Sequence, residues 1–267
     1  MSNMFCFQCQ EAAKGTGCTL KGVCGKNDTT ARAMDLLLFT VRGISIVATE
    51  LRKNGKQPCD KLNTFVTDAL FSTITNANFD DDSIYTRVDE GFIKRNKLIG
   101  KALEMGISLP EIDELKWTGT REQYDEKAAK VGVMRETNED IRSLKELIVY
   151  GLKGMAAYLE HANRLGYNDV SLHAFIQSTL ATITVDNLST EELTTLALKT
   201  GEMGVQTMAL LDTANTSSYG HPEITSVSIG VRNNPGILIS GHDLHDLEQL
   251  LEQTKDRGVD VYTHGEM

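Results

Sequence analysis

The sequence lacks a long hydrophobic run. Its longest apolar stretch is Leu36 to Phe39, which Val41 continues before Arg42 interrupts it. A helix needs roughly 20 apolar residues to cross a bilayer. The first residues, MSNMFCFQCQ, also lack the basic flank and the apolar core of a signal peptide. We therefore expect a cytoplasmic protein that does not insert into a membrane.

Blocks of lysine or arginine are absent as well. The formal net charge is −10, with Lys+Arg 27 against Asp+Glu 37. Nucleic acids and anionic membranes bind proteins through basic surfaces, so neither is expected as a partner. A content of 40% hydrophobic and 24% charged residues is instead typical of a folded globular protein.

Helical periodicity covers most of the chain. Apolar residues at helical spacing after Thr29-Thr30 predict a helix to about Lys53, and Asn54-Gly55 ends it. Further helices are expected over residues 62–76 and 84–105. The polar stretch 109–133 indicates a connection with one short helix.

The second helical region repeats the first. The segment from Asp35 to Gly55 aligns without a gap with the segment from Glu146 to Gly166. The aligned pairs include Leu36 with Leu147, Phe39 with Tyr150, Arg42 with Lys153 and Gly43 with Gly154. One residue out of step, Leu62, Phe65, Leu70 and Thr73 align with Leu172, Phe175, Leu180 and Ile183. We therefore predict two duplicated three-helix bundles, the second ending with a helix from about Ser189 to Asp212.

Gly43 and Gly154 lie in the middle of their predicted helices. A glycine there costs about 1 kcal/mol relative to alanine. Close approach of a neighbouring helix is a plausible compensation, so we expect close packing at both glycines.

The last part of the chain changes character. Residues 225–231, 237–240 and 259–264 are rich in β-branched residues and predict strands, with a helix over 243–256. This order predicts a parallel βαβ unit, the start of a Rossmann-like α/β domain. Because roughly forty residues rarely fold alone, we interpret it as the opening of a larger domain. The predicted segments are a cluster-binding segment 1–28, a first bundle 29–108, a connection 109–140, a second bundle 141–221 and the βαβ unit 222–267.

Four cysteines stand close together near the start, at Cys6, Cys9, Cys18 and Cys24. Their spacing, C-x2-C-x8-C-x5-C, with glycines in the second half, is typical of a metal site, and four thiolates suit zinc or an iron–sulfur cluster. Zinc sites usually pair two short knuckles, so the x5 spacing favours iron and sulfur. Cys59 stands alone; such a cysteine is usually a small buried hydrophobe, and we assign it no role.

Polar residues follow two of the predicted strands. His242 comes directly after 237–240, and His264 and Glu266 come after 259–263. Ligands of open parallel sheets bind outside the carboxyl ends of strands, so His242 and Glu266 could share a metal. The residues alone favour a simpler interpretation, in which Asp243 caps a helix and the others are solvated. His245 is a weak candidate for a supporting role, and His161, His173 and His221 are interpreted as ordinary surface or loop histidines.

The cysteine segment MFCFQCQEAAKGTGC-TLKGVCGK, the helix DLLLFTVRGIS and the tail NNPGILISGHDLHDLEQLLEQT…GVDVYTHGEM together resemble the hybrid cluster proteins, or hydroxylamine reductases. The resemblance runs from Met4 to Met267 and corresponds to the N-terminal half of a family member. It implies that Cys6, Cys9, Cys18 and Cys24 bind a [4Fe-4S] cubane. It also implies that His242 and Glu266 are ligands of a hybrid [4Fe-2O-2S] cluster, whose other ligands lie in the half that this chain lacks.

The resemblance implies an iron–sulfur oxidoreductase that reduces hydroxylamine to ammonia and water, with nitric oxide reduction as a related activity. The cubane would relay electrons from a donor protein to the hybrid cluster, and a monomer is expected. The present chain is expected to bind the cubane without completing the active site. The alternative is a zinc-stabilised helical interaction module without catalytic activity.

Overall fold

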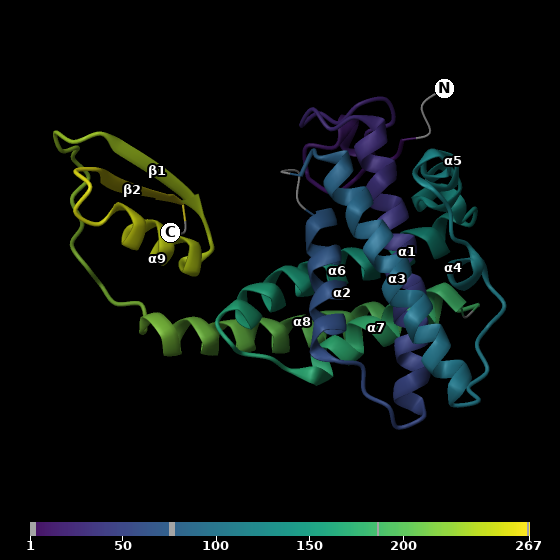
Figure 1. Cartoon of the computed structure of the whole chain (residues 1–267). Coiled ribbons are helices and arrows are strands. Elements are labelled where there is room, and N and C mark those ends of the chain that lie inside the picture. Colours follow the sequence, from purple (N-terminus) through teal and green to yellow (C-terminus); the bar gives the residue numbers. More distant parts are fainter. Residues whose placement is uncertain (1–3, 75–77, 186, 266) are drawn as a thin grey trace.

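The computed structural model describes residues 4–74, 78–185, 187–265 and 267. Most of these residues are helical, and a two-stranded parallel sheet lies near the C-terminal end (Figure 1). The helices are α1 (Asp28–Lys53), α2 (Asp60–Ile74), α3 (Asp81–Glu104), α4 (Asp113–Lys116), α5 (Arg121–Val131), α6 (Glu139–Arg164), α7 (Val170–Val185), α8 (Thr190–Tyr219) and α9 (Leu244–Thr254). The strands are β1 (Gly236–Gly241) and β2 (Asp260–Gly265), and short 3-10 turns cover Ala13–Gly15 and Val133–Arg135. The mainly helical fold class is confirmed.

Local signals set the ends of the first helix of each unit. The Asn27 side chain caps α1 by accepting a hydrogen bond of 2.8 Å from the Thr30 amide. Asn138 caps α6 in the same way, through the amides of Asp140 and Ile141. Such caps satisfy amides that have no partner inside the helix. After α1, Gly55 has φ +76°, a conformation that favours glycine and stops the helix.

The two helical units interlock. Each first helix packs against the third helix of its own unit, α1 on α3 and α6 on α8. The second helices pack mainly on the opposite unit, with α2 against α6 and α7 against α1. One continuous hydrophobic core therefore contains side chains of both units.

Buried hydrogen bonds also join α2 of the first unit to α7 of the second. Gln177 donates to Asn63 over 3.0 Å, and Thr67 Oγ1 lies 3.1 Å from His173 Nδ1. In the alignment of the two units, Asn63 corresponds to His173 and Thr67 to Gln177. The pair Asn63–Gln177 therefore corresponds to the pair His173–Thr67, which is the pattern of an approximate twofold relation. His173 is buried, so the expectation of a surface histidine is wrong.

The two mid-helix glycines differ. A Cβ at Gly43 would lie 2.3 Å from the backbone oxygen of Glu114 in α4 and 2.9 Å from the Arg95 side chain. Close packing is therefore confirmed at Gly43. A Cβ at Gly154 would meet nothing within 4 Å, so the same expectation is wrong there. No partner helix covers that position of α6 among the described residues.

The connection and the tail depart from the prediction in three places. The connection holds two helices, α4 and α5, where one was expected, and α8 continues to Tyr219. Residues 225–231 form no strand, and Ile229 is fully exposed. A β-branched run forms a strand only when a neighbour completes its hydrogen bonds, and no described segment pairs with it.

The predicted parallel pair is present, since β1 lies beside β2 with Gly236 opposite Asp260 and Gly241 opposite Gly265. Helix α9 connects the two strands, so the βαβ order is confirmed. Among the described residues, no helix has the length and apolar character needed to cross a membrane.

Candidate metal centres

The N-terminal cysteine segment forms a loop over one end of α1 (Figure 1, purple). Cys6 and Cys18 pair as an antiparallel bridge, with hydrogen bonds of 3.1 Å from Cys6 N–H to Cys18 O and 2.8 Å in return. Cys18 is buried in a small apolar cluster with Met4 and Ala31. The fold thus brings together two cysteines that the sequence keeps apart.

Tight turns shape the rest of this loop. Gly17 has φ +151°, and a Cβ there would lie 2.8 Å from the Phe5 ring, so the position requires glycine. The Ala13 amide donates to Cys18 Sγ over 3.4 Å. Amide hydrogen bonds to sulfur are a recognised means of tuning iron–sulfur clusters. Cys9 is half-buried and Cys24 is exposed.

The chemistry of these donors fits a cluster. All four cysteines are free thiols in one loop, and one of them already accepts an amide hydrogen bond. Among the described residues, no three His, Cys, Asp or Glu side chains gather at a single-ion site. The assignment of Cys6, Cys9, Cys18 and Cys24 as ligands therefore remains a prediction that rests on their type and spacing.

The turn between Cys6 and Cys9 rests on α6. Tyr150 Oη donates to the Gln8 carbonyl over 3.3 Å, and Lys153 Nζ donates to Gln8 Oε1 over 3.3 Å. The Phe7 and Tyr150 rings have centroids 6.4 Å apart. Beside the turn lies a cavity of about 650 Å³, lined in part by Cys9, Glu146 and Tyr150. Helix α6 therefore forms the support of the cysteine loop.

Four charged residues meet between α1 and α6, namely Asp35, Arg42, Glu146 and Lys153. Arg42 Nη2 lies 3.7 Å from Glu146 Oε1. Burial raises the pKa of Asp35 to about 7, although the positive charge of Lys153 opposes the rise. Burial lowers the pKa of Arg42 to about 10 and that of Lys153 to about 8.

We did not single out these charges from the sequence. The signal was present in the alignment of the two units, where Asp35 corresponds to Glu146 and Arg42 to Lys153. An acid followed seven residues later by a base, twice over, marks positions on one side of each helix. Only their burial in the folded chain makes them notable.

The second candidate site lies at the edge of the parallel sheet. His242 is exposed directly after β1, and Ser240 Oγ lies 3.0 Å from His264 Nδ1 across the sheet. Because Gly241 lies opposite Gly265, the two strands end at the same edge of the sheet. Glu266 lies outside the described residues. The pairing of His242 with Glu266 therefore remains a prediction.

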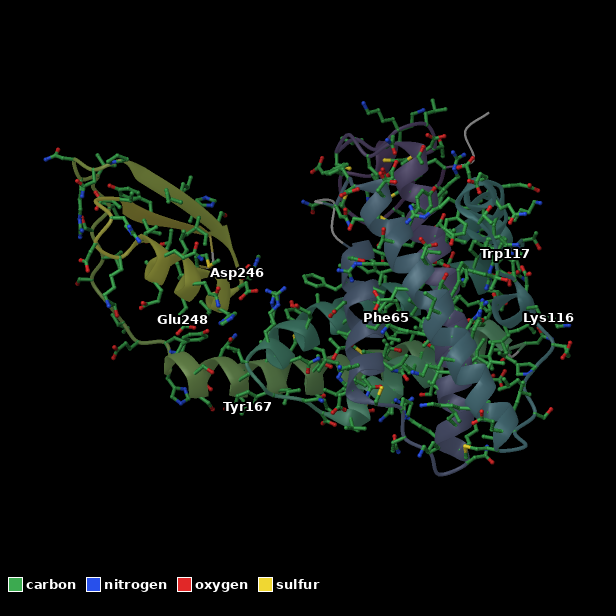
Figure 2. The ribbon with its side chains drawn as sticks, in the orientation of Figure 1. Phe65, Lys116, Trp117, Tyr167, Asp246 and Glu248 are labelled. Carbon is green, nitrogen blue, oxygen red and sulfur yellow. The ribbon has the colours of Figure 1, made fainter. Side chains whose placement is uncertain are left out.

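Helix α9 contacts the helical body at this edge. Asp243 caps α9, as predicted, and its Oδ2 lies 3.1 Å from His161 Nδ1. Figure 2 marks Asp246 and Glu248 on α9; Arg164 lies 3.4 Å from Asp246, and Tyr219 donates to Glu248 over 3.1 Å.

A cavity of about 430 Å³ at this edge includes His161, His242 and His245 but no cysteine. Cys59 is exposed at the start of α2, so the expectation of burial is wrong. The described residues at the sheet edge therefore do not by themselves fit a cluster that needs thiolates.

The cysteine loop thus defines a candidate iron–sulfur protein. Residues 4–267 match the Prismane/CO dehydrogenase family, and the chain belongs to that family. A hydroxylamine reductase of Bacteroides thetaiotaomicron is 56% identical over 265 residues, which cover 99% of this chain and 48% of that protein. Hydroxylamine reductases of Desulfitobacterium hafniense and Clostridium perfringens are 56% and 57% identical over 270 residues, covering 99% of this chain and 49% of each relative.

The chain spans about half the length of these curated relatives. The resemblance drawn from the cysteine segment and the tail is confirmed at the level of the family. Family and relatives together imply an iron–sulfur protein and disfavour the zinc-stabilised interaction module.

Proposed function

We propose that this chain is the electron-receiving part of a hydroxylamine reductase-type oxidoreductase, with a [4Fe-4S] cluster held by Cys6, Cys9, Cys18 and Cys24. The observation that carries the proposal is the cysteine loop, in which four free thiols share one folded segment and Cys6 pairs with Cys18. When bound, the cluster supplies one-electron transfer. The loop residues would hold the thiolates, and Phe5 and Phe7, which flank Cys6 in the sequence, would shield the cluster from water.

The reaction proposed for the complete protein follows from the name of the relatives. Hydroxylamine takes up two electrons and two protons, its N–O bond breaks, and ammonia and water leave. The partners are this small substrate and an electron donor protein. Five free cysteines favour a reducing compartment, so the proposal includes the cytoplasm.

His242 and Glu266 are proposed as two ligands of the second, hybrid centre at the sheet edge. Since the described residues supply no thiolate there, completing that centre requires further polypeptide. We therefore expect the purified chain to reduce no hydroxylamine with a chemical electron donor. Hydroxylamine reduction by this chain alone would contradict the proposal that the chain binds the [4Fe-4S] cluster but does not complete the hybrid centre.

The cluster can be tested by purifying the chain without oxygen and measuring iron and acid-labile sulfide. We expect a brown protein with about four irons and four sulfides per chain. Cys9→Ser should lose most of the iron, whereas Cys59→Ser is the matched control and should keep it. A colourless protein with one zinc would overturn the proposal.

A further inference from the structure

A buried lysine lies next to the cysteine loop. Lys153 on α6 is 5% exposed, and its Nζ donates to Gln8 Oε1 over 3.3 Å. Gln8 is within the C-x2-C turn, between Cys6 and Cys9. A buried ammonium carries a large desolvation cost, which is offset only where nearby negative charge or dipoles favour it. The Gln8 side chain in the cysteine turn is therefore one of the groups that stabilise the buried ammonium of Lys153.

The surroundings of Lys153 contain charges of both signs. Burial lowers the pKa of Lys153 to about 8, and the negative charges of Glu146, Asp35 and Cys6 oppose that lowering. Arg42 lies behind the same group and contacts Glu146. Lys153 is thus mainly charged at neutral pH.

Further charged residues near Asp35, Arg42, Glu146 and Lys153 come from elements other than α1 and α6. Glu114 of α4 and Arg135 are paired with each other over 2.7 Å, and both act on Arg42. Lys26 precedes α1, is buried, and acts on Asp35. The cations that act on Asp35 are therefore Lys153, Arg42 and Lys26.

Reducing an iron–sulfur cluster adds one negative charge to it. A fixed cation nearby stabilises the reduced form more than the oxidised form, and low dielectric strengthens the effect. We propose that Lys153 is a positioning residue that raises the reduction potential of the iron–sulfur cluster on the cysteine loop, with Glu146 acting in the opposite direction. This inference rests on the proposed [4Fe-4S] site and adds a residue from outside the cysteine segment.

The test is a redox titration of the cluster-loaded chain, followed by visible absorption and electron paramagnetic resonance. Lys153→Met should lower the equilibrium constant for one-electron reduction by about tenfold, which corresponds to about 59 mV. Lys153→Arg keeps the charge and should stay close to the wild type. Lys127→Met is the control, because Lys127 is also buried but contacts Asp113 and the rings of Phe39 and Trp117.

Glu146→Gln gives a second, independent readout. This substitution removes a negative charge from the group of charged side chains around Lys153. It should therefore raise the reduction potential, whereas Lys153→Met should lower it. A purely structural role would not produce opposite shifts from two neighbouring variants. If Lys153→Met fails to load iron, Lys153→Gln, which removes the charge but keeps a polar side chain, is measured in its place.

The outcomes separate the two proposals. A wild-type chain without iron and sulfide overturns the cluster and this inference with it. A loaded Lys153→Met chain whose potential is unchanged overturns the role of Lys153 alone. Equal shifts in Lys153→Met and Lys127→Met would also overturn it, because the effect would then not depend on proximity to the loop.

Discussion

Helices α1 and α6 come from matching sequence but occupy different surroundings. Leu36 of α1 is 0% exposed, whereas its counterpart Leu147 of α6 is 58% exposed. The same holds for Phe39, at 0%, and Tyr150, at 40%. The polar connection between the two units explains the difference, because α4 and α5 pack on α1. The duplication accounts for the matching residues of α1 and α6. The segments packed around each helix determine how many of these residues are buried.

The open side of α6 is where the candidate site lies. Its free face lines an apolar groove of about 480 Å³ with α8, and the next positions support the cysteine loop. On α1 the equivalent surface is filled, and Arg42 contacts Glu146 instead of the loop. Tyr150 and Lys153 of the less buried copy therefore contact the turn between Cys6 and Cys9.

The largest expected difference between the two helices concerns the aligned leucines. Leu36→Ala should lower the free energy of unfolding by about 3 kcal/mol, because it opens a cavity in the core. Leu147→Ala should change it by less than about 0.5 kcal/mol. Urea unfolding of both variants tests this, and equal losses would show that the two positions are packed alike.

The aligned glycines should respond in opposite directions. Gly43→Ala places a methyl group against the backbone of α4 and should cost about 2 to 3 kcal/mol. Gly154→Ala meets no atom and should stabilise α6 by up to about 1 kcal/mol through helix propensity. Thermal unfolding of the two variants measures the sign, and a stabilised Gly43→Ala would contradict the close approach.

The buried contact between Thr67 of α2 and His173 of α7 gives a pH-dependent test. Burial lowers the pKa of His173 from 6.5 to about 4. The folded state therefore resists protonation, and stability that is present above pH 6.5 is lost as the pH falls towards 4. His173→Asn, the residue of its counterpart Asn63, should remove about 2 kcal/mol of this acid-dependent loss. Urea unfolding between pH 4 and 7.5 provides the comparison, and an unchanged slope would contradict it.

Asp35 should show the smallest effect, with the opposite sign. Burial raises its pKa from 3.8 to about 7, so the folded state binds the proton more tightly than the unfolded state. Stability therefore falls as the pH rises from about 4 to 7 and is constant above. Asp35 lines a cavity, so solvent weakens the effect, and Asp35→Asn should recover about 1 kcal/mol at pH 8. Equal stability of wild type and variant below about pH 4, where Asp35 is protonated in both the folded and the unfolded state, is the internal control.

Much of the fold could be predicted because its signals are local. Gly55 as a stop and the periodicity before it define α1 within a few residues, although Asn27 and not Thr29-Thr30 supplies the cap. The strand at 225–231 was predicted from the same kind of local preference and is absent. A strand also needs a partner, and that information is not contained in the segment itself.

The candidate site divides in the same way. The spacing of Cys6, Cys9, Cys18 and Cys24 indicates a metal site, and the family resemblance names the cluster. Neither pointed to Lys153, because its closeness to Gln8 depends on how α6 crosses the loop.

The sequence by itself determined most of the helices, the parallel pair and the candidate ligands, because each depends mainly on residues close together in the chain. Only the tertiary structure decided that α2 packs on α6 and α7 on α1, and that Gly43 is covered while Gly154 is open. It also decided that Asp35, Arg42, Glu146 and Lys153 meet between α1 and α6. Burial and charge interaction depend on distances in space, and a repeated sequence therefore produced two helices with different surroundings and different roles.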